Sequence, residues 1–226
     1  MSKKSICFIP AKGYSERLNN KNILPVCGIP LILRSVASAI DSGCFDIVAV
    51  SSDSDKILSM SQSAGALALK RDASMATKDF RAKDVVWHHL LELEEEFEYI
   101  SLLMNTNPFR TAEDIQRANR LIKSNLDKTL ISAKRYQFTP FMALDVSSDG
   151  RLLNYETLSW QQESSFPQRY HFNGAIFIAK YNYFMEHRTF VSDKTSVYLM
   201  SETNSLDIDT AEDYQLANLM CDNLSL

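Results

Sequence analysis

The first apolar run of the chain, residues 5–9, is short and continuous, which is typical of a strand buried on both faces. The polar stretch that follows, residues 12–22, is too long and irregular for a simple connection. Long ordered loops of this kind usually serve a function. We therefore expect a binding loop directly after the first strand.

Further along the chain, helical and extended patterns alternate. Apolar residues at helical spacing predict helices over residues 31–42, 54–64, 85–97, 111–122 and 211–221. Short apolar runs predict strands at residues 47–51, 99–104, 130–133, 173–179 and 196–200. This alternation predicts an α/β fold in one domain over residues 1–226. Its sheet should be doubly wound and mostly parallel, with a ligand crevice at the carboxyl ends of the strands.

The segment 138–155 interrupts the alternation. Two extended runs flank the sequence Ser-Ser-Asp-Gly at residues 147–150, which is typical of a hairpin turn. We expect residues 138–170 to leave the main sheet as a small extended excursion that serves dimerisation and the substrate site.

Composition excludes several classes of protein. The 24 Lys and Arg against 28 Asp and Glu give a net charge of -4, without the basic excess expected of a nucleic-acid-binding protein. No run approaches the roughly 18 apolar residues of a membrane span, so we expect no membrane partner and a cytoplasmic location. The four cysteines form no C-x-x-C pair, which favours reduced, mostly buried thiols over a disulfide framework or a zinc site.

The loop at residues 12–22 has the chemistry of an anion site. Lys12, Arg17 and Lys21 can neutralise phosphates. Ser15 can donate a hydrogen bond, and backbone amides near Gly13 can face an anion. A solvated basic loop is the alternative on charge alone. Neither a Walker A loop nor the G-x-G-x-x-G fingerprint is present, so an NAD-dependent oxidoreductase would rest on fold class alone.

A second candidate site is the pair Asp207 and Asp209. In extended chain, residues two apart place both carboxylates on one face, where their hard oxygens can hold Mg²⁺. The alternative is that the two aspartates are solvated or cap the following helix.

The loop after the first strand resembles a known motif. Its residues Ile-Pro-Ala-Lys-Gly-Tyr-Ser at 9–15, followed by Lys-Asn at 21–22, are similar to the I-P-A-R-G-G-S-K…K-N motif of acylneuraminate cytidylyltransferases. The resemblance continues in order through residues 27–32, 46–53, 107–110, 173–178 and 205–210. It implies a nucleotide-diphospho-sugar transferase-like fold, a homodimer, and transfer of CMP from CTP to the anomeric hydroxyl of a nonulosonic acid, with release of pyrophosphate.

The resemblance also implies roles for particular residues. Lys12, Gly13, Ser15, Arg17 and Lys21 would hold the triphosphate. Asn22, Arg71 and the residue at position 104 would contact the rest of the nucleotide, and Asn173 the sugar acid. The D-x-D motif would hold Mg²⁺, with Lys21 and Asp209 as catalytic residues. Either Asp209 takes a proton through a metal-bound water, or no side chain takes it.

Some positions differ from the family pattern. Met104 replaces a glutamine that typically contacts the base, so the base contact would pass to Asn105 or Asn107. Where the family often has basic residues before the 173–178 strand, this chain has Glu163 and His171, with Arg169 as a substitute cation for the sugar carboxylate. These differences predict an altered base or sugar-acid specificity, or a catalytically silent relative that only binds.

Overall fold

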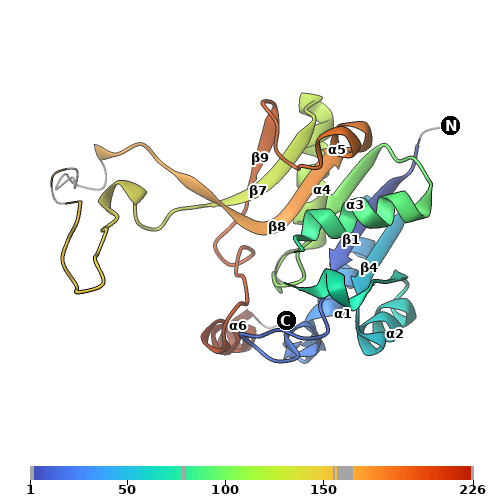
Figure 1. Cartoon of the computed structure of the whole chain (residues 1–226), viewed down its shortest axis with the longest axis horizontal. Coiled ribbons are helices and arrows are strands. Elements are labelled where there is room, and N and C mark those ends of the chain that lie inside the picture. Colours follow the sequence, from blue (N-terminus) through green and yellow to red (C-terminus); the bar gives the residue numbers. More distant parts are fainter. Residues whose placement is uncertain (1–2, 78–79, 155, 157–164, 225–226) are drawn as a thin grey trace.

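The computed structural model describes residues 3–77, 80–154, 156 and 165–224, and its centre is a seven-stranded sheet in the order β5-β4-β1-β6-β8-β7-β9 (Figure 1). The strands are β1 Ser5–Pro10, β4 Ile47–Ser52, β5 Leu67–Lys70, β6 Tyr99–Leu102, β7 Thr129–Arg135, β8 Tyr170–Lys180 and β9 Thr195–Leu199. Strand β8 is antiparallel to both β6 and β7, whereas the other pairs are parallel. The predicted mostly parallel α/β sheet is confirmed.

Helices cover both faces of this sheet. They are α1 Leu31–Asp41, α2 Asp55–Ser63, α3 Ala82–Leu93, α4 Ala112–Asn125, α5 Tyr181–His187 and α6 Ala211–Leu224, with short 3-10 turns at Lys21–Ile23, Ala73–Ala76 and Pro140–Met142. Helices α1, α2 and α4 pack on one face, and α3 and α5 on the other. Strand β1 sends Cys7 and Ile9 to the first face and Ile6 and Phe8 to the second, which accounts for its continuous apolar run.

None of the helices in the described ranges is both long and apolar enough to cross a bilayer.

Several predicted boundaries are wrong. Phe97 was expected at the end of a helix, but α3 ends at Leu93, and Glu94 follows with a φ of 49°. Phe97 lies in the next connection and is only 1% exposed, so its apolar character reflects core packing rather than helical spacing. The small hairpin of β2 Pro25–Val26 with β3 Ile29–Pro30 was not predicted.

The chain between β7 and β8 projects away from the sheet (Figure 1). The predicted turn is present, because the Ser147 N–H donates to the Arg151 carbonyl at 2.9 Å and an antiparallel bridge joins Val146 to Leu152. Phe138 on this excursion is 79% exposed. Residues 155 and 157–164, which the prediction also included, lie outside the described residues.

The expectation of reduced thiols is wrong for two of the four cysteines. Cys27, in the β2–β3 turn, forms a disulfide with Cys221 of α6, while Cys7 is a buried free thiol and Cys44 a half-buried one. A small apolar cluster that includes Val26 brings the hairpin and the helix together. Sequence spacing could not indicate this pairing, because the two cysteines are 194 residues apart.

We predict that a reducing agent lowers the free energy of unfolding by about 2–4 kcal/mol, because the cross-link restricts the unfolded chain over a separation of 194 residues. Urea denaturation with and without dithiothreitol measures this change. The Cys27→Ser/Cys221→Ser variant is the control, since its transition should not respond to reductant. Identical transitions for the unaltered chain under both conditions would contradict the prediction.

Candidate functional site

A cavity of about 1160 Å³ opens where the chain leaves the carboxyl ends of β1 and β6. Pro10 and Leu102, the last residues of these two strands, lie in its wall. The loop at residues 12–22 and the segment at 207–209 line the same cavity, although they lie at opposite ends of the sequence. The crevice is therefore at the sheet edge where the fold class predicts it.

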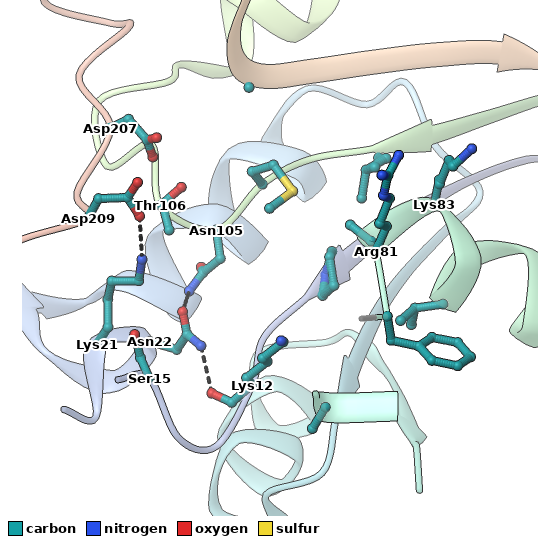
Figure 2. Close-up of a pocket in the computed structure, with 18 of the residues that line it drawn as sticks. Lys12, Ser15, Lys21, Asn22, Arg81, Lys83, Asn105, Thr106, Asp207 and Asp209 are labelled. Carbon is teal, nitrogen blue, oxygen red and sulfur yellow. Dashed lines mark hydrogen bonds and ion pairs between the residues drawn. The ribbon is translucent and has the colours of Figure 1, made fainter. Parts of the chain in front are cut away.

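The two aspartates of the D-x-D motif point into this cavity because the residue between them is buried. Ile208 is fully buried, and its N–H donates to the Thr106 carbonyl at 2.9 Å. In extended chain, its neighbours Asp207 and Asp209 then face the other way, and both line the cavity. Figure 2 shows both side chains on one wall.

The start of α6 fixes the backbone at Asp209. The Asp213 carboxylate accepts hydrogen bonds from the N–H groups of Asp209, at 3.0 Å, and Thr210, at 2.8 Å. The Asp213 N–H in turn donates to the Thr210 hydroxyl at 3.2 Å. This reciprocal capping of the helix holds the D-x-D segment in place. The helix-capping alternative raised by the sequence therefore applies to Asp213 rather than to Asp209.

Two cations of the loop meet Asp209. Its Oδ1 atom lies 3.0 Å from Lys21 Nζ and 3.1 Å from an Arg17 guanidinium nitrogen (Figure 2 draws the contact with Lys21). Lys21 is only 8% exposed, so its ammonium group depends on this partner for compensation. The structure thus joins the predicted phosphate loop to the predicted metal ligands.

Asp207 lies in the same wall without an ion-pair partner among the described residues. The protein atoms that displace water around this carboxyl raise its pKa, and the negative charge of Asp209 acts in the same direction. A hydrogen bond with Thr106 opposes these effects. Two neighbouring carboxylates with hard oxygen atoms, of which Asp207 has no ion pair in the described structure, fit the ligand preference of Mg²⁺.

A chain of amide contacts runs from the loop to the end of β6. The Asn22 Nδ2 donates to the Lys12 carbonyl at 2.6 Å, and the Asn105 Nδ2 donates to Asn22 Oδ1 at 2.9 Å (Figure 2). Asn105 is 1% exposed, and its Oδ1 accepts no hydrogen bond within the described structure. A buried unpaired acceptor in a cavity wall is available to a ligand donor.

Lys12 and Gly13 are both held by neighbouring chain. The Lys12 ammonium donates to the Thr77 carbonyl at 2.6 Å, and burial, together with the charge of Arg71, lowers its pKa. The Gly13 N–H, expected to face an anion, donates instead to Asp53 at 2.9 Å. A Cβ atom at Gly13 would lie 3.0 Å from Ser54 Cβ, so a larger residue here would require Ser54 to shift.

Arg71 forms part of the cavity wall. It is 3% exposed, and its guanidinium lies 3.6 Å from the Asp53 carboxylate. Burial lowers its pKa, and its Nε and one Nη atom have no hydrogen-bond partner in the described part of the chain. Ser15, another predicted phosphate ligand, also lines the cavity.

A Ser-His-Glu arrangement with a buried serine and histidine and an exposed glutamate lies close to this wall. The Ser51 hydroxyl is 2.8 Å from His89 Nε2, and His89 Nδ1 is 2.8 Å from the Glu92 carboxylate. Burial lowers the pKa of His89. Ser51 is 1% exposed and does not line the cavity, so it is no nucleophile for a substrate there. The arrangement ties β4 to α3, which carries His89 and Glu92.

The segment after β6 is fixed from inside the protein. Arg110, 4% exposed, donates to the carbonyls of Met104, at 2.8 Å, and Ala175, at 3.1 Å, and burial lowers its pKa to about 10. The Asn107 amide donates to the Asn173 and Leu206 carbonyls, both at 3.2 Å. Met104 therefore lies in the cavity wall at a fixed position, whereas Asn107 does not line the cavity.

Asn173, a predicted sugar ligand, is 6% exposed and sits inside the protein. Its Oδ1 accepts from the Ser132 hydroxyl at 2.6 Å, and its Nδ2 donates to the Ser205 hydroxyl at 2.8 Å. The register of β7 and β8 shifts at this point, where Gly174 has a φ of 73° and lines the cavity. Asn173 thus supports the bulge, and Gly174 lines the cavity.

The other two predicted sugar ligands lie away from the large cavity. The Arg169 guanidinium is 5.0 Å from the ring centroid of Phe141 on the excursion. His171 lines a second cavity of about 520 Å³, where its ring is 4.5 Å from that of Tyr136. Phe172, 64% exposed, lines both cavities and is the link between them.

The sequence did not indicate the wall formed by the start of α3. Phe80, Arg81 and Lys83 line the large cavity there. Figure 2 shows Arg81 and Lys83 on the side opposite Lys21 and Asp209. A sequence analysis could have identified these residues only from their position, since they lie where a helix begins near the carboxyl edge of the sheet.

Two solved structures show the same fold at 14% identity. One is described as CMP:2-keto-3-deoxy-manno-octonic acid synthetase complexed with CTP, with a TM-score of 0.72 over 97% of this chain and 99% of that one. The other is 4-diphosphocytidyl-2C-methyl-D-erythritolsynthase from Anaerococcus prevotii, with a TM-score of 0.70 over the same shares of the two chains.

Sequence relatives cover the chain almost completely. It is 31% identical to the N-acylneuraminate cytidylyltransferase of Escherichia coli over 96% of this chain, which spans about half (52%) of that protein. It is 26% identical to the pseudaminic acid cytidylyltransferase of Campylobacter jejuni, with 96% of both chains covered. It is 29% identical to the CMP-N,N'-diacetyllegionaminic acid synthase of Legionella pneumophila, with 93% of both covered.

The family assignment combines these likenesses with the site. A family model described as Cytidylyltransferase matches residues 6–223. That range includes the loop after β1, the start of α3 and the D-x-D segment that together line the large cavity. This chain belongs to the cytidylyltransferase family.

Proposed function

We propose that this protein transfers CMP from CTP to the anomeric hydroxyl of a nonulosonic acid and releases pyrophosphate. The observation that supports this best is the contact of Lys21 and Arg17 with Asp209, which places phosphate-binding cations beside a pair of carboxylates in one cavity. Relatives named for N-acylneuraminate, pseudaminic acid and diacetyllegionaminic acid support the sugar class. We place the reaction in the cytoplasm, where CTP is available.

In this proposal the loop after β1 binds the triphosphate. Ser15 donates a hydrogen bond to a phosphate oxygen, while Lys12, Arg17 and Lys21 neutralise its charge. As the bond to the α-phosphate breaks, negative charge grows on the pyrophosphate, and a buried ammonium such as Lys21 stabilises it most strongly. Asn22 and the free Oδ1 of Asn105 lie further along the wall, where they can meet the ribose.

Asp207 and Asp209 are the residues that would hold Mg²⁺. When bound, the ion supplies charge neutralisation and orientation of the phosphate oxygens for an in-line displacement. The capping of α6 by Asp213 keeps both carboxylates on the cavity wall. Asp209 would then share its oxygens between the ion, Lys21 and Arg17.

The sugar acid would enter on the side of β8. Gly174 and Phe172 line the cavity there, and Gly174 leaves room for a ligand next to the backbone. Arg169 lies on the excursion rather than in the cavity of its own chain. We infer a homodimer in which the excursion and the adjoining start of β8 reach the site of the second copy and present Arg169 and His171 to the sugar carboxylate.

A catalytically silent binding protein is the second candidate. Met104 lies in the cavity wall where an amide would read a base, and Arg169 and His171 do not line that cavity within one chain. A silent relative would bind CTP without releasing pyrophosphate.

An activity matrix decides between these candidates. We expect pyrophosphate release when the protein is incubated with CTP, Mg²⁺ and a nonulosonic acid, background release with ATP or GTP, and much slower release with UTP than with CTP. Coupled phosphate detection after pyrophosphatase treatment measures it. Binding of CTP in calorimetry with no turnover for any sugar in the panel would support the silent relative.

The Asp209→Asn variant should lose about 100-fold or more in kcat, because it removes a carboxylate charge beside Lys21 and weakens the metal site. Steady-state kinetics across a Mg²⁺ titration measure the loss. The matched control is Asp193→Asn, an exposed carboxylate outside the cavity, which should leave kcat unchanged. Equal kcat for Asp209→Asn and the control would contradict the proposed role.

The excursion should hold the dimer together. We predict that Phe138→Asp with Leu144→Asp converts a dimer into a monomer, because these side chains are 79% and 60% exposed in one chain and would lose apolar contact with a partner. Light scattering after gel filtration measures the mass. Leu126→Asp, at a side chain 75% exposed after α4, is the control and should remain dimeric. A monomeric unaltered protein would refute the dimer.

A further inference from the structure

The large cavity has two chemically different ends. The acids and phosphate-loop cations lie at one end, around Lys21 and Asp209 (Figure 2). At the other end, on the side of α3, apolar residues such as Leu102 and Met104 line the cavity beside the cations Arg81 and Lys83. If the triphosphate binds at the end with the acids, the base of the nucleotide must lie toward the end beside α3.

Arg81 lies at the end of the cavity beside α3. It is the residue before the first turn of α3, and its backbone N–H donates to the Asp84 carboxylate at 3.3 Å. This contact fixes the backbone and leaves the side chain free. Arg81 lines the cavity, and Figure 2 shows its side chain on the side opposite Asn105 and Thr106.

Neighbouring cations of the cavity are already engaged. The Lys12 ammonium donates to the Thr77 carbonyl, and the Lys83 ammonium donates to the Arg188 carbonyl at 3.1 Å. Arg71 lies 3.6 Å from Asp53 and is 3% exposed, so its two unpaired guanidinium nitrogens lie deeper in the wall than the exposed Arg81. The Arg81 guanidinium forms neither an ion pair nor a hydrogen bond with any residue that the structure describes. An exposed arginine is ordinarily a solvated surface group, but this one lines a cavity and has all its side-chain donors available.

We propose that Arg81 reads the base of CTP, an inference that rests on the proposed nucleotidyl transfer. Cytosine presents two adjacent acceptors, O2 and N3, and the guanidinium fork can donate one hydrogen bond to each. Uracil has an N3–H donor in place of the N3 acceptor, which opposes an arginine N–H. The Arg81 fork therefore favours cytosine over uracil. Met104, which lines the same cavity, cannot take this role because its thioether has no hydrogen-bond donor.

A sugar carboxylate is the competing ligand for such a fork. The acceptor hydroxyl must reach the α-phosphate near Asp207 and Asp209, whereas Arg81 stands on the opposite side of the cavity (Figure 2). This separation favours the base over the sugar acid. The two ligands are distinguished by which KM changes when Arg81 is replaced.

The test compares kcat/KM for CTP and UTP in the unaltered protein and in the Arg81→Lys and Arg81→Gln variants. We expect the CTP-to-UTP ratio to fall about 10-fold to 100-fold in both variants, because lysine keeps the charge but loses the fork. Lys83→Gln is the matched comparison, since it removes one positive charge from the same helix start. It should affect CTP and UTP equally.

Three results would overturn the role of Arg81. The first is an unchanged ratio in Arg81→Gln, which would leave Asn105 as the base reader. The second is a ratio kept by lysine, which would mean that charge alone is recognised. The third is a raised KM for the sugar acid with the ratio unchanged. Melting temperatures confirm that the variants fold, which is expected because the backbone of Arg81, not its side chain, contacts Asp84.

Binding of CMP and UMP, measured by calorimetry, separates this inference from the proposed function. If the unaltered protein releases no pyrophosphate with any nucleotide, the proposed transfer fails, but a preference for CMP that Arg81→Gln abolishes still supports Arg81 as the base reader. If CMP and UMP bind equally, or if the preference survives in Arg81→Gln, the inference is wrong whatever the activity.

Discussion

The site depends on the ion pair between Lys21 and Asp209. An ammonium group that is only 8% exposed is costly unless a carboxylate compensates it, and here the partner comes from the far end of the chain. The pair joins the loop after β1 to the segment before α6 and so creates one cavity from two distant motifs. Because Asp209 also meets Arg17, the cations proposed to bind phosphate and the candidate metal ligands share one position.

Helix α6 holds this arrangement, although it lies outside the layers of the sheet. Asp213 at its start binds the backbone of Asp209, and Ile208 is buried in the cluster that includes residues of the β2–β3 hairpin. The Tyr214 hydroxyl donates to the Pro25 carbonyl at 2.8 Å, and Cys27 and Cys221 complete the attachment. The reduction potential of the surrounding compartment determines what fraction of the molecules has the Cys27–Cys221 disulfide formed.

The cavity separates two tasks that nucleotidyl transfer requires. Its charged end can hold phosphates with little regard to the base, since Lys21 and Arg17 recognise charge. At the opposite end, Arg81 at the start of α3 and the Met104 thioether line the wall, and in the proposal the Arg81 guanidinium distinguishes the bases. Reaction type and base specificity can therefore change independently in this fold.

The sequence by itself determined the class of fold and the position of the loop. The continuous run at β1 and the alternation of periods predict a parallel sheet, and the carboxyl-edge rule then places Lys12, Ser15 and Lys21 at the crevice. Local periodicity is enough to predict these elements, because the spacing of apolar residues along a helix or strand indicates which of its faces is buried. The D-x-D spacing likewise predicted that both carboxylates would share one side of the chain.

Only the tertiary structure decided which residues meet. The burial of Asn173, the commitment of the Gly13 amide to Asp53 and the Cys27–Cys221 disulfide depend on contacts between distant segments, which sequence spacing does not record. Arg81 belongs to the same group, because its motif is ordinary and only the packing of α3 beside β1 and β6 directs it into the cavity. The local sequence determines which face of a helix or strand is apolar. Packing between distant segments determines which residues that face, and the ends of the element, contact.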